Sequence, residues 1–413
     1  MIPTPAEALA RILAEVAPLP PQRRPLPEVL GLALGEDLHS RATVPPFSNS
    51  AMDGYAVRAG DLAAVSPEQP LRLRVLGDLA AGDTPRQPVG PGEALRIMTG
   101  APLPEGADTV VPVEQTTRGD GAGEAWVELH QPQRAGLHVR HTGEDLREGQ
   151  LLLRAGHGLR PGDLGALAAA GIPELAVHRR LRVAVLTTGD ELVDVSEEPG
   201  PGRIRDANIH ALCAQVRACG ATPLPFERIP DDRERLLYTL RQALEADVVL
   251  TTGGISVGDY DHMKGLLEEL SAQRIFWKVA QKPGGPLGFW KLGTTPIFGI
   301  PGNPVAAMLM VEEFVRPALR RLMGFSKLHR PTVEATLEGG WAGKLGDHRT
   351  TYLRVVAQRE GAAYRAQLTG PQGSAILSSM ILANALAVIP AGVDRVEPGG
   401  TVTLHLTEEN EDH

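Results

Sequence analysis

Long hydrophobic runs are missing from this sequence. No stretch approaches the roughly 18 consecutive apolar residues of a membrane helix, so we expect neither a membrane-spanning segment nor a membrane partner. The N-terminal residues MIPTPAEALARILAEV have no basic region ahead of an apolar block. This pattern argues against a secretory signal, and we expect a cytoplasmic protein.

Cysteine is scarce as well, with Cys213 and Cys219 as the two in the chain. They stand six residues apart on a predicted helix, and at about 100° per residue they point to different faces. That spacing suits neither a disulfide framework nor a zinc site. We therefore expect two reduced thiols, as is usual in a cytosolic protein.

Aromatic residues make up only 4% of the chain, too few for platforms on which bases stack, and the net charge is −9. A protein that holds duplex DNA usually carries a basic excess, so we expect no nucleic-acid partner. Lysine is rare, and the first in the chain is Lys264. A preference for arginine codons explains this, but Lys278 and Lys282 both fall within FWKVAQKPGGP, which singles out that segment.

At 413 residues the chain is too long for one ordinary core, and we expect roughly two to four domains. TPAEALARILAEV reads as a helix, and a second helical segment, RPGDLGALAAAGI, follows a long β-like stretch broken by Gly and Pro. We expect these two helices to pack near each other. The pattern predicts a discontinuous helical domain (1–41 and 146–178), a β-rich insertion domain (42–145), a central α/β domain (179–325) and a C-terminal β-barrel or sandwich (326–413).

Apolar strands and amphipathic helices alternate through the central domain. LRVAVLTTGDEL, DVVLTTGG and PIFGIPGNP each read as a buried strand that runs into a loop, and helical segments follow. This alternation predicts a doubly wound, mainly parallel sheet covered by helices on both faces. In such sheets ligands bind beyond the carboxyl ends of the strands, where loops lead into helix N-termini.

Three loops at these predicted strand ends have unusual compositions: TTGDEL (187–192), TTGGISVGDYD (251–261) and GIPGNP (299–304). Gly253, Gly254 and Gly302 let backbone N–H groups approach a ligand, and free N–H groups favour an anion. None of the loops matches the P-loop or the dinucleotide-binding pattern. A tight turn explains any one of them, but three in one sheet predict a site for a phosphate-like anion.

The same loops carry carboxylates, which have two explanations. Asp is favoured at helix starts whatever the function, so capping is the first. The second is a cation site, because carboxylates repel a bound phosphate unless a cation such as Mg²⁺ lies between them. The residues concerned are Asp190, Glu191, Asp206, Asp259 and Asp261.

The β-rich insertion contains two elaborate loops, PPFSNSAMDGYAVR (45–58) and IMTGAPLPEGADTVV (97–111). Asp53-Gly54 is consistent with a plain turn, and a simple hairpin would not need the second loop. At these residues, and at GRIRDAN, TTGGISVGDYD and GIPGNPVAA, the chain resembles the MoeA family of molybdopterin molybdenumtransferases, which includes the gephyrin E domain. The motifs occur in the family's order and spacing, from about residue 4 to residue 405.

The resemblance implies the last step of molybdenum cofactor synthesis. In that family adenylylated molybdopterin is hydrolysed, AMP leaves, and molybdate is inserted at the dithiolene with the help of Mg²⁺. The family is dimeric, and the insertion of one subunit faces the central domain of the other. The resemblance also implies that the molybdopterin adenylyltransferase and cofactor-accepting apoenzymes are partners.

Carried over by position, the resemblance implies three sets of residues beside the adenylate. Pterin and phosphate groups would be held by Thr251, Thr252, Gly253, Gly254, Ser256, Gly258, Asp206, Asn208, Pro301, Gly302, Asn303 and Pro304. The metal would lie near Asp190, Glu191 and Asp261. Catalytic roles would fall to Asp53, Thr99, Asp145, Glu191 and Asp261.

Molybdate would be gathered by Lys278, Lys282, Pro286, Arg354 and Ser379. This suits the chemistry of a doubly charged oxyanion, which is bound well by lysine, an arginine fork and a hydroxyl. The chain departs from the pattern at Gly285, where several relatives carry a further lysine. The affinity for molybdate over sulfate or tungstate therefore stays open, as does the choice between molybdenum and tungsten.

Three other functions are consistent with parts of the sequence. A non-catalytic scaffold of the gephyrin type would need an added linker and partner surfaces. A molybdopterin adenylyltransferase uses the isolated central domain, and the flanking domains argue against it. A generic nucleotide hydrolase would share the α/β unit alone.

Overall fold

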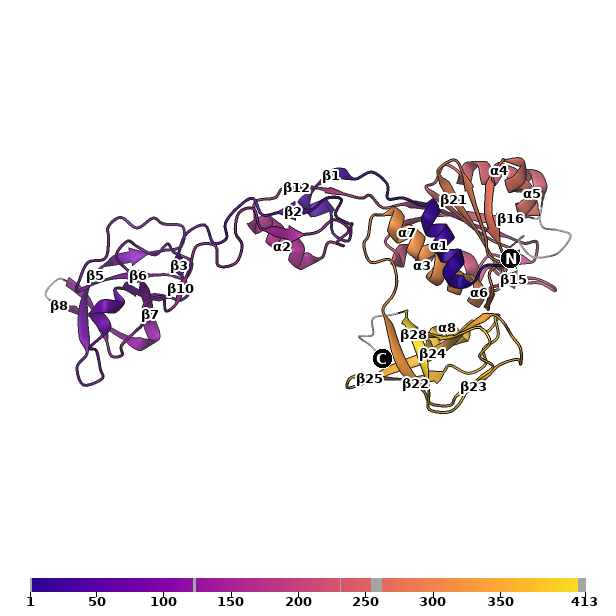
Figure 1. Ribbon diagram of the computed structural model, residues 1–413. Coiled ribbons are helices and arrows are strands. Elements are labelled where there is room, and N and C mark those ends of the chain that lie inside the picture. Colours follow the sequence, from indigo (N-terminus) through magenta and orange to yellow (C-terminus); the bar gives the residue numbers. More distant parts are fainter. Residues whose placement is uncertain (1, 122–123, 231, 254–261, 408–413) are drawn as a thin grey trace.

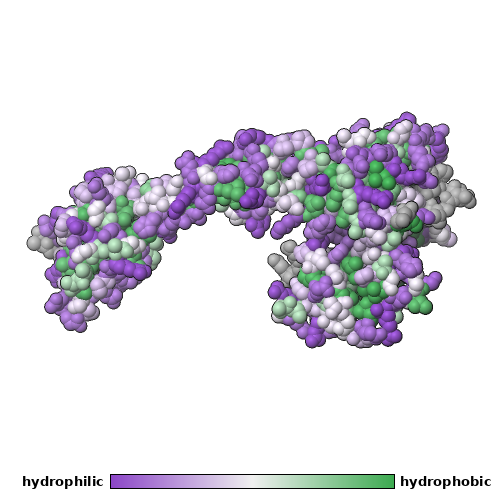
Figure 2. Space-filling model, in the orientation of Figure 1, coloured by the Kyte–Doolittle hydropathy of each residue, from purple (hydrophilic) through white to green (hydrophobic). Residues whose placement is uncertain are grey.

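The computed structural model describes residues 2–121, 124–230, 232–253 and 262–407. Figure 1 shows an extended molecule: a body built from a central sheet and a C-terminal barrel, and an arm that carries a second β module at its far end. In Figure 2 hydrophobic residues form separate patches on the body and the arm rather than one continuous band. Among the described residues no helix is long and apolar enough to cross a membrane.

The central sheet has the strand order β16-β13-β17-β21-β20-β18. The first four strands pair in parallel, whereas β20 and β18 pair antiparallel, so the predicted mainly parallel sheet gains an antiparallel edge. The strands are β13 (Arg182–Thr188), β16 (Thr222–Ile229), β17 (Val248–Thr252), β18 (Gln273–Trp277), β20 (Gly288–Leu292) and β21 (Thr295–Ile300).

The sheet is covered on both faces because its side chains alternate between two apolar clusters. Val183 and Val185 belong to one cluster, while Ala184 and Leu186 belong to the other. Burial on both sides explains why these strands read as continuous apolar runs. The covering helices are α3 (Ala207–Ala218), α4 (Arg233–Ala243), α5 (His262–Glu269), α6 (Pro304–Met310), a π-helical turn η4 (Val311–Val315) and α7 (Arg316–Leu322).

Cys213 lies in the middle of α3 and Cys219 is its C-cap, and both are buried as free thiols. Burial is the main cause that raises the pKa of Cys219 to about 12, because the thiolate would lose its hydration. Both thiols are therefore unreactive core residues, in line with the sequence.

The far module of the arm is a six-stranded sheet of order β7-β4-β6-β5-β9-β8, which agrees with the β-rich insertion expected from the sequence. Its elements are β3 (Asn49–Ser50), β4 (Gly54–Val57), η2 (Ala59–Leu62), β5 (Leu71–Leu79), β6 (Glu93–Ile97), β7 (Thr109–Pro112), η3 (Val113–Gln115), β8 (Thr116–Gly121), β9 (Glu124–Leu129) and β10 (Val139–Arg140).

The near part of the arm contains α2 (Pro161–Ala169) and short strand pairs. Strand β1 (Gln22–Pro25) pairs with β12 (Glu174–Val177), and β2 (Leu38–His39) pairs with β11 (Leu151–Leu153). Helix α2 packs on η1 (Leu26–Glu28), with Leu167 in a local apolar cluster. The boundaries that the sequence predicts for the four domains stay a prediction.

Helix α1 (Pro5–Glu15) does not pack near α2, and the expectation that the two helices lie together is wrong. Its N-cap Thr4 and Glu7 form a capping box, as suits a helix start. Its buried residues Ala8 and Ile12 join the core of the central domain, where α1 contacts α7. An amphipathic pattern predicts that a helix buries one face, but it does not predict which part of the protein that face packs against.

The C-terminal region closes into a barrel, which settles the choice between barrel and sandwich. The ring runs β24-β25-β22-β28-β26 and back to β24. Strand β19 (Gln281–Lys282), from the central part of the chain, pairs in parallel with β24. The barrel strands are β22 (Thr332–Leu337), β24 (Thr350–Glu360), β25 (Ala363–Leu368), β26 (Ala385–Ile389) and β28 (Gly400–Leu406), and smaller elements are β14 (Leu192–Val193), β15 (Ile204–Arg205), β23 (Trp341–Ala342), α8 (Ser378–Leu382) and β27 (Arg395–Val396).

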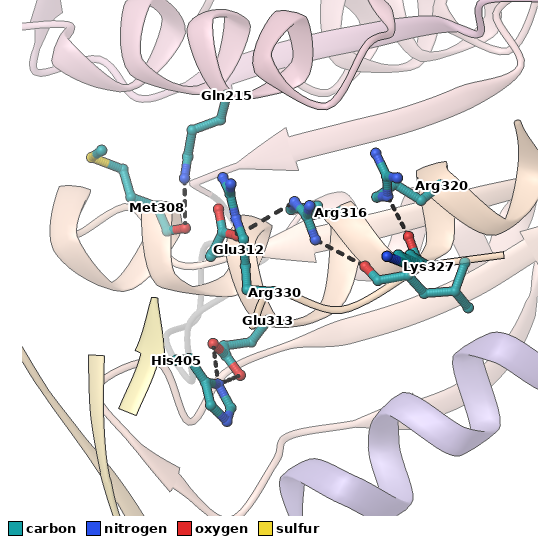
Figure 3. A network of polar contacts seen from close by, with 10 residues as sticks. Gln215, Met308, Glu312, Glu313, Arg316, Arg320, Lys327, Arg330 and His405 are labelled. Atoms are coloured by element: carbon teal, nitrogen blue, oxygen red, sulfur yellow. Dashed lines mark hydrogen bonds and ion pairs between the residues drawn. The ribbon is translucent and has the colours of Figure 1, made fainter. Parts of the chain in front are cut away.

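Polar contacts join the barrel to the helix that follows β21, as Figure 3 shows. Glu312 accepts from Arg330 at 2.6 Å and also pairs with Arg316 at 3.5 Å. From the barrel strand β28, His405 places Nδ1 at 3.0 Å from each carboxylate oxygen of Glu313. The barrel is therefore held to the body by charged groups as well as by the β19–β24 backbone pairing.

The His405–Glu313 contact predicts a pH-dependent contribution to stability. The hydrogen bond to Glu313 outweighs burial and raises the pKa of His405 above its ordinary value. Protonated His405 then stabilises the folded chain fully below its unfolded pKa of about 6.5, and this contribution is lost as pH rises through the folded pKa. We expect His405→Gln to lower the free energy of unfolding by about 1 kcal/mol in weakly acidic buffer and by less at alkaline pH.

Urea unfolding of wild type and His405→Gln at a series of pH values measures this difference. The exposed His348, which has the same ionisable ring, gives the matched control variant His348→Gln. A wild-type-minus-variant difference that stays flat from about pH 5 to about pH 9 would contradict the assignment.

Candidate functional site

A cavity of about 760 Å³ lies at the carboxyl ends of the central strands. The loops after β13, β17 and β21 all reach it, as expected for parallel strands whose ends share one edge of a sheet. The loops 282–286 and 372–375 complete the wall. Its lining includes Thr187, Thr188, Glu191, Asp206, Asn208, Thr252, Gly253, Lys282, Pro283, Gly284, Pro286, Pro301, Gly302, Asn303, Pro304, Gln372, Gly373, Ser374 and Ala375.

The strand-end loops pack so closely that one of them requires glycine. Gly253 has a φ of +88°, and a Cβ atom there would lie 2.3 Å from the carbonyl oxygen of Thr188. Thr252 is buried and donates its hydroxyl to the carbonyl of Pro301 at 2.8 Å, which ties the second loop to the third. The absence of a side chain at Gly253 therefore lets the backbone of these loops form one continuous floor.

Asp206 and Asn208 enter the cavity from the start of α3. Asp206 is the N-cap of the helix and accepts from the amide of Ile209 at 3.1 Å, so capping accounts for one of its oxygens. Thr187 donates to the other oxygen at 2.5 Å. Asn208 donates to the carbonyl of Gly302 at 2.7 Å and to Thr252 at 3.3 Å. These contacts hold the polar floor in one arrangement.

Among the cavity-lining residues, the hydroxyl oxygen of Thr188 and the carboxamide oxygen of Asn208 are buried and have no hydrogen-bond partner within the described residues. The hydroxyl of Thr251 is also unpaired there, but Thr251 is not among the residues that line the cavity. Buried polar groups are otherwise almost always paired, because an orphan group costs about 1–3 kcal/mol. Unpaired polar atoms that gather beside a cavity indicate a ligand that supplies the missing partners.

The predicted metal ligands are only partly described. Glu191 lines the cavity, and Asp190 beside it is exposed, with its backbone carbonyl accepting from Arg203 at 2.7 Å. Gly254, Ser256, Gly258, Asp259 and Asp261 lie outside the described residues. Within the described ranges no group of three His, Cys, Asp or Glu side chains could hold a metal ion.

Arg354 lies directly behind the wall formed by residues 372–375. Its guanidinium is fully buried and donates to Ser379 at 3.2 Å and to the carbonyl of Gly373 at 3.1 Å, while Nη1 has no partner in the described part of the chain. Burial alone lowers the pKa of Arg354 to about 10, and no described carboxylate offsets it. An uncompensated buried cation beside a cavity favours a bound anion.

Of the remaining residues expected around molybdate, some line the cavity and others do not. Lys282 and Pro286 line the cavity, whereas Lys278 is not among its lining residues. Gly285 lies in the same turn, where a Cβ atom would have 3.6 Å to the nearest backbone oxygen, so a side chain has room there. Sequence reasoning missed Gln372 and its neighbours, although the turn composition of TGPQGS could have pointed to a loop.

Asp53 and Thr99 meet each other, but far from the cavity. They lie in the far module of the arm, at the opposite end of the molecule from the central sheet (Figure 1). Asp53 accepts from the backbone amide and from the hydroxyl of Thr99, each at 2.7 Å, and these two bonds lower the pKa of its carboxyl group. Asp145 is exposed on the arm. Within one chain these three residues do not join the cavity.

Comparison with known proteins places the chain in a family. The profile described as MoeA N-terminal region (domain I and II) matches residues 4–171, a probable molybdopterin binding domain matches residues 184–321, and the MoeA C-terminal region (domain IV) matches residues 342–407.

Curated relatives and a solved structure agree with these profiles. The chain is 35% identical to the molybdopterin molybdenumtransferase of Bacillus subtilis, over 91% of this chain and 88% of that protein. It is 37% identical to molybdopterin molybdenumtransferase 2 of Mycobacterium tuberculosis, over 91% and 92%. A molybdopterin biosynthesis MoeA protein from Pyrococcus horikoshii superposes with a TM-score of 0.81 at 29% identity, covering 98% of this chain and all of that one. The chain therefore belongs to the MoeA family of molybdopterin molybdenumtransferases.

Proposed function

We propose that this protein transfers molybdenum from molybdate to adenylylated molybdopterin and releases AMP. The observation that carries the proposal is the buried guanidinium of Arg354, which has no carboxylate partner among the described residues and lies behind the wall of the strand-end cavity. Molybdate is a doubly charged oxyanion, which suits an arginine fork flanked by a hydroxyl and a lysine. Family membership supports the same reaction.

The strand-end loops would bind the pterin and its phosphates. The amides around Gly253 and Gly302 and the unpaired oxygens of Thr188 and Asn208 offer donors and acceptors on one side of the cavity. Lys282, Pro286, Arg354 and Ser379 would hold molybdate on the opposite side. Molybdate would then lie next to the dithiolene, which would couple its insertion to the release of AMP.

The residues present fit a magnesium ion that is shared with the substrate. Mg²⁺ typically binds through one or two carboxylates plus substrate phosphates and waters, and Glu191 on the cavity wall, with Asp190 beside it in the chain, would supply them. When bound there, the ion would neutralise the adenylyl phosphate and act as a Lewis acid for its cleavage.

Asp53 would act on the substrate of a second subunit. The two hydrogen bonds from Thr99 keep its carboxyl group ionised, so it can accept a proton from the attacking water but cannot donate one. Because the arm carries Asp53 away from its own cavity, the proposal requires a homodimer in which each arm reaches the partner's central domain. Asp145 would belong to the same acidic rim.

The pathway further suggests a cytoplasmic enzyme that receives its substrate from the molybdopterin adenylyltransferase and passes its product to apoenzymes. The cavity and the unpaired polar atoms of its lining support a small-ligand site rather than a scaffold role. The choice between molybdenum and tungsten would depend on oxyanion size at the Arg354 end.

Release of AMP from adenylylated molybdopterin tests the function directly. We expect release to require molybdate and to fall at least about 10-fold when EDTA removes divalent cations, with recovery on addition of Mg²⁺. Release of AMP that does not depend on molybdate would favour a generic nucleotide hydrolase instead. Consumption of ATP with metal-free molybdopterin would favour an adenylyltransferase.

A further inference from the structure

The edge of β24 at Arg354 is paired in an unusual way. Strand β25 pairs with β24 up to Leu368 opposite Val355, and the chain then turns away. The carbonyl of Arg354 still accepts from the amide of Thr369, the next residue, and from the Thr369 hydroxyl, both at 3.1 Å. The buried amide of Arg354 loses its backbone acceptor at this point, and such a group must be paired.

The side chain of Gln372 supplies the acceptor that the amide of Arg354 lacks. Its carboxamide oxygen accepts from the amide of Arg354 at 2.8 Å, and its nitrogen donates to the carbonyl of Arg354 at 3.2 Å. The carboxamide thus stands where the peptide group of a neighbouring strand would stand. This substitution lets the chain leave the barrel early and form the cavity wall at residues 372–375.

The same side chain sets the surroundings of the guanidinium. Gly373 follows Gln372 directly and presents its carbonyl to Nη2 of Arg354 at 3.1 Å, and Ser379 accepts from Nε on the other side. Nη1 is left buried without a partner within the described residues. Arg354 is not among the residues that line the cavity, so the wall at residues 372–375 lies between its guanidinium and the cavity.

We propose that Gln372 is a positioning residue for the oxyanion substrate: it clamps the wall at residues 372–375 onto the backbone of Arg354 and so aims the unpaired guanidinium edge at the bound oxyanion. This inference rests on the proposed function, because it takes molybdate as the anion. The amide of Arg354 needs the acceptor oxygen of Gln372, because Thr369 bonds only the carbonyl of Arg354, and the carboxamide nitrogen adds a further donor to that carbonyl. Glutamate would turn a second acceptor toward the carbonyl of Arg354 and add a competing negative charge.

Isothermal titration of the full-length protein with sodium molybdate alone tests the proposal. We expect Gln372→Ala to weaken binding about 10-fold and Gln372→Glu to weaken it more, while the number of sites per chain is unchanged. Gln367→Ala is the matched control, because Gln367 is exposed on the neighbouring strand β25 and should leave the dissociation constant as in wild type. A merely structural role would lower the number of functional sites and leave the dissociation constant of the remaining sites unchanged.

A double-mutant cycle shows whether Gln372 acts through Arg354. In an Arg354→Gln background, Gln372→Ala should cost little further affinity. The inference is overturned if Gln372→Ala binds molybdate as tightly as wild type, or if the two losses simply add. If wild type itself does not bind molybdate, both the proposed function and this inference are contradicted. If wild type binds molybdate and Gln372→Ala binds it equally tightly, only this inference is contradicted.

Discussion

Replacing Arg354 with glutamine is expected to reduce molybdenum insertion about 100-fold or more, while the stability of the fold changes by about 1 kcal/mol at most. The loss of activity follows from the charge-assisted hydrogen bonds that the guanidinium would make to a dianionic oxyanion. Stability should change little, because the lost bonds to Ser379 and Gly373 are offset when an uncompensated charge is no longer buried.

Molybdenum insertion and urea unfolding, measured on the same preparations, separate the two effects. Arg359→Gln is the matched control, since Arg359 is exposed on the same strand β24 and donates to the carbonyl of Gly361 at 3.0 Å. It should retain wild-type activity. A variant at Arg354 that inserts molybdenum normally would remove the main support for the proposed oxyanion site.

Asp53→Ala is expected to lower release of AMP and molybdenum insertion about 100-fold with the fold intact, because a positioned general base typically contributes a factor of this size. The structure adds a stronger expectation. Asp53 lies between β3 and β4 of the arm, and Arg354 lies in β24 of the body, at the other end of the molecule (Figure 1). If two subunits share each site, a mixed dimer of Asp53→Ala and Arg354→Gln chains contains one intact site.

Two inactive variants should therefore complement each other. Purified mixed dimers carrying two different affinity tags should recover about half of the wild-type activity, since one of the two shared sites combines an intact arm with an intact body. Asp61→Ala is the control within the same module, because Asp61 also accepts a backbone amide, that of Gly92 at 3.0 Å. Mixed dimers that stay inactive would mean that each chain builds its site alone, and a fully active Asp53→Ala would refute its catalytic role.

The strands and loops of the central sheet are the features that the sequence predicts best, because hydrophobic pattern and sheet geometry both constrain them. Continuous apolar runs predicted strands buried on both faces, and the observed alternation of Val183 and Ala184 between two clusters explains why. The capping role considered for the acidic loop residues is observed at Asp206. The resemblance rather than periodicity pointed to Arg354 and Ser379, and nothing in the local pattern suggested a buried guanidinium.

By itself the sequence determined the parallel core, the three strand-end loops that meet at one edge, and the β-rich insertion, because these follow from hydrophobic period and from residues suited to turns. Only the tertiary structure decided that α1 packs on the central domain, that Gln372 takes the place of a missing strand, and that Asp53 lies far from the cavity of its own chain. These outcomes depend on contacts between segments distant in sequence. Local periodicity predicts which face of a helix or strand is buried. Packing and the pairing of buried polar groups determine which distant segment that face contacts.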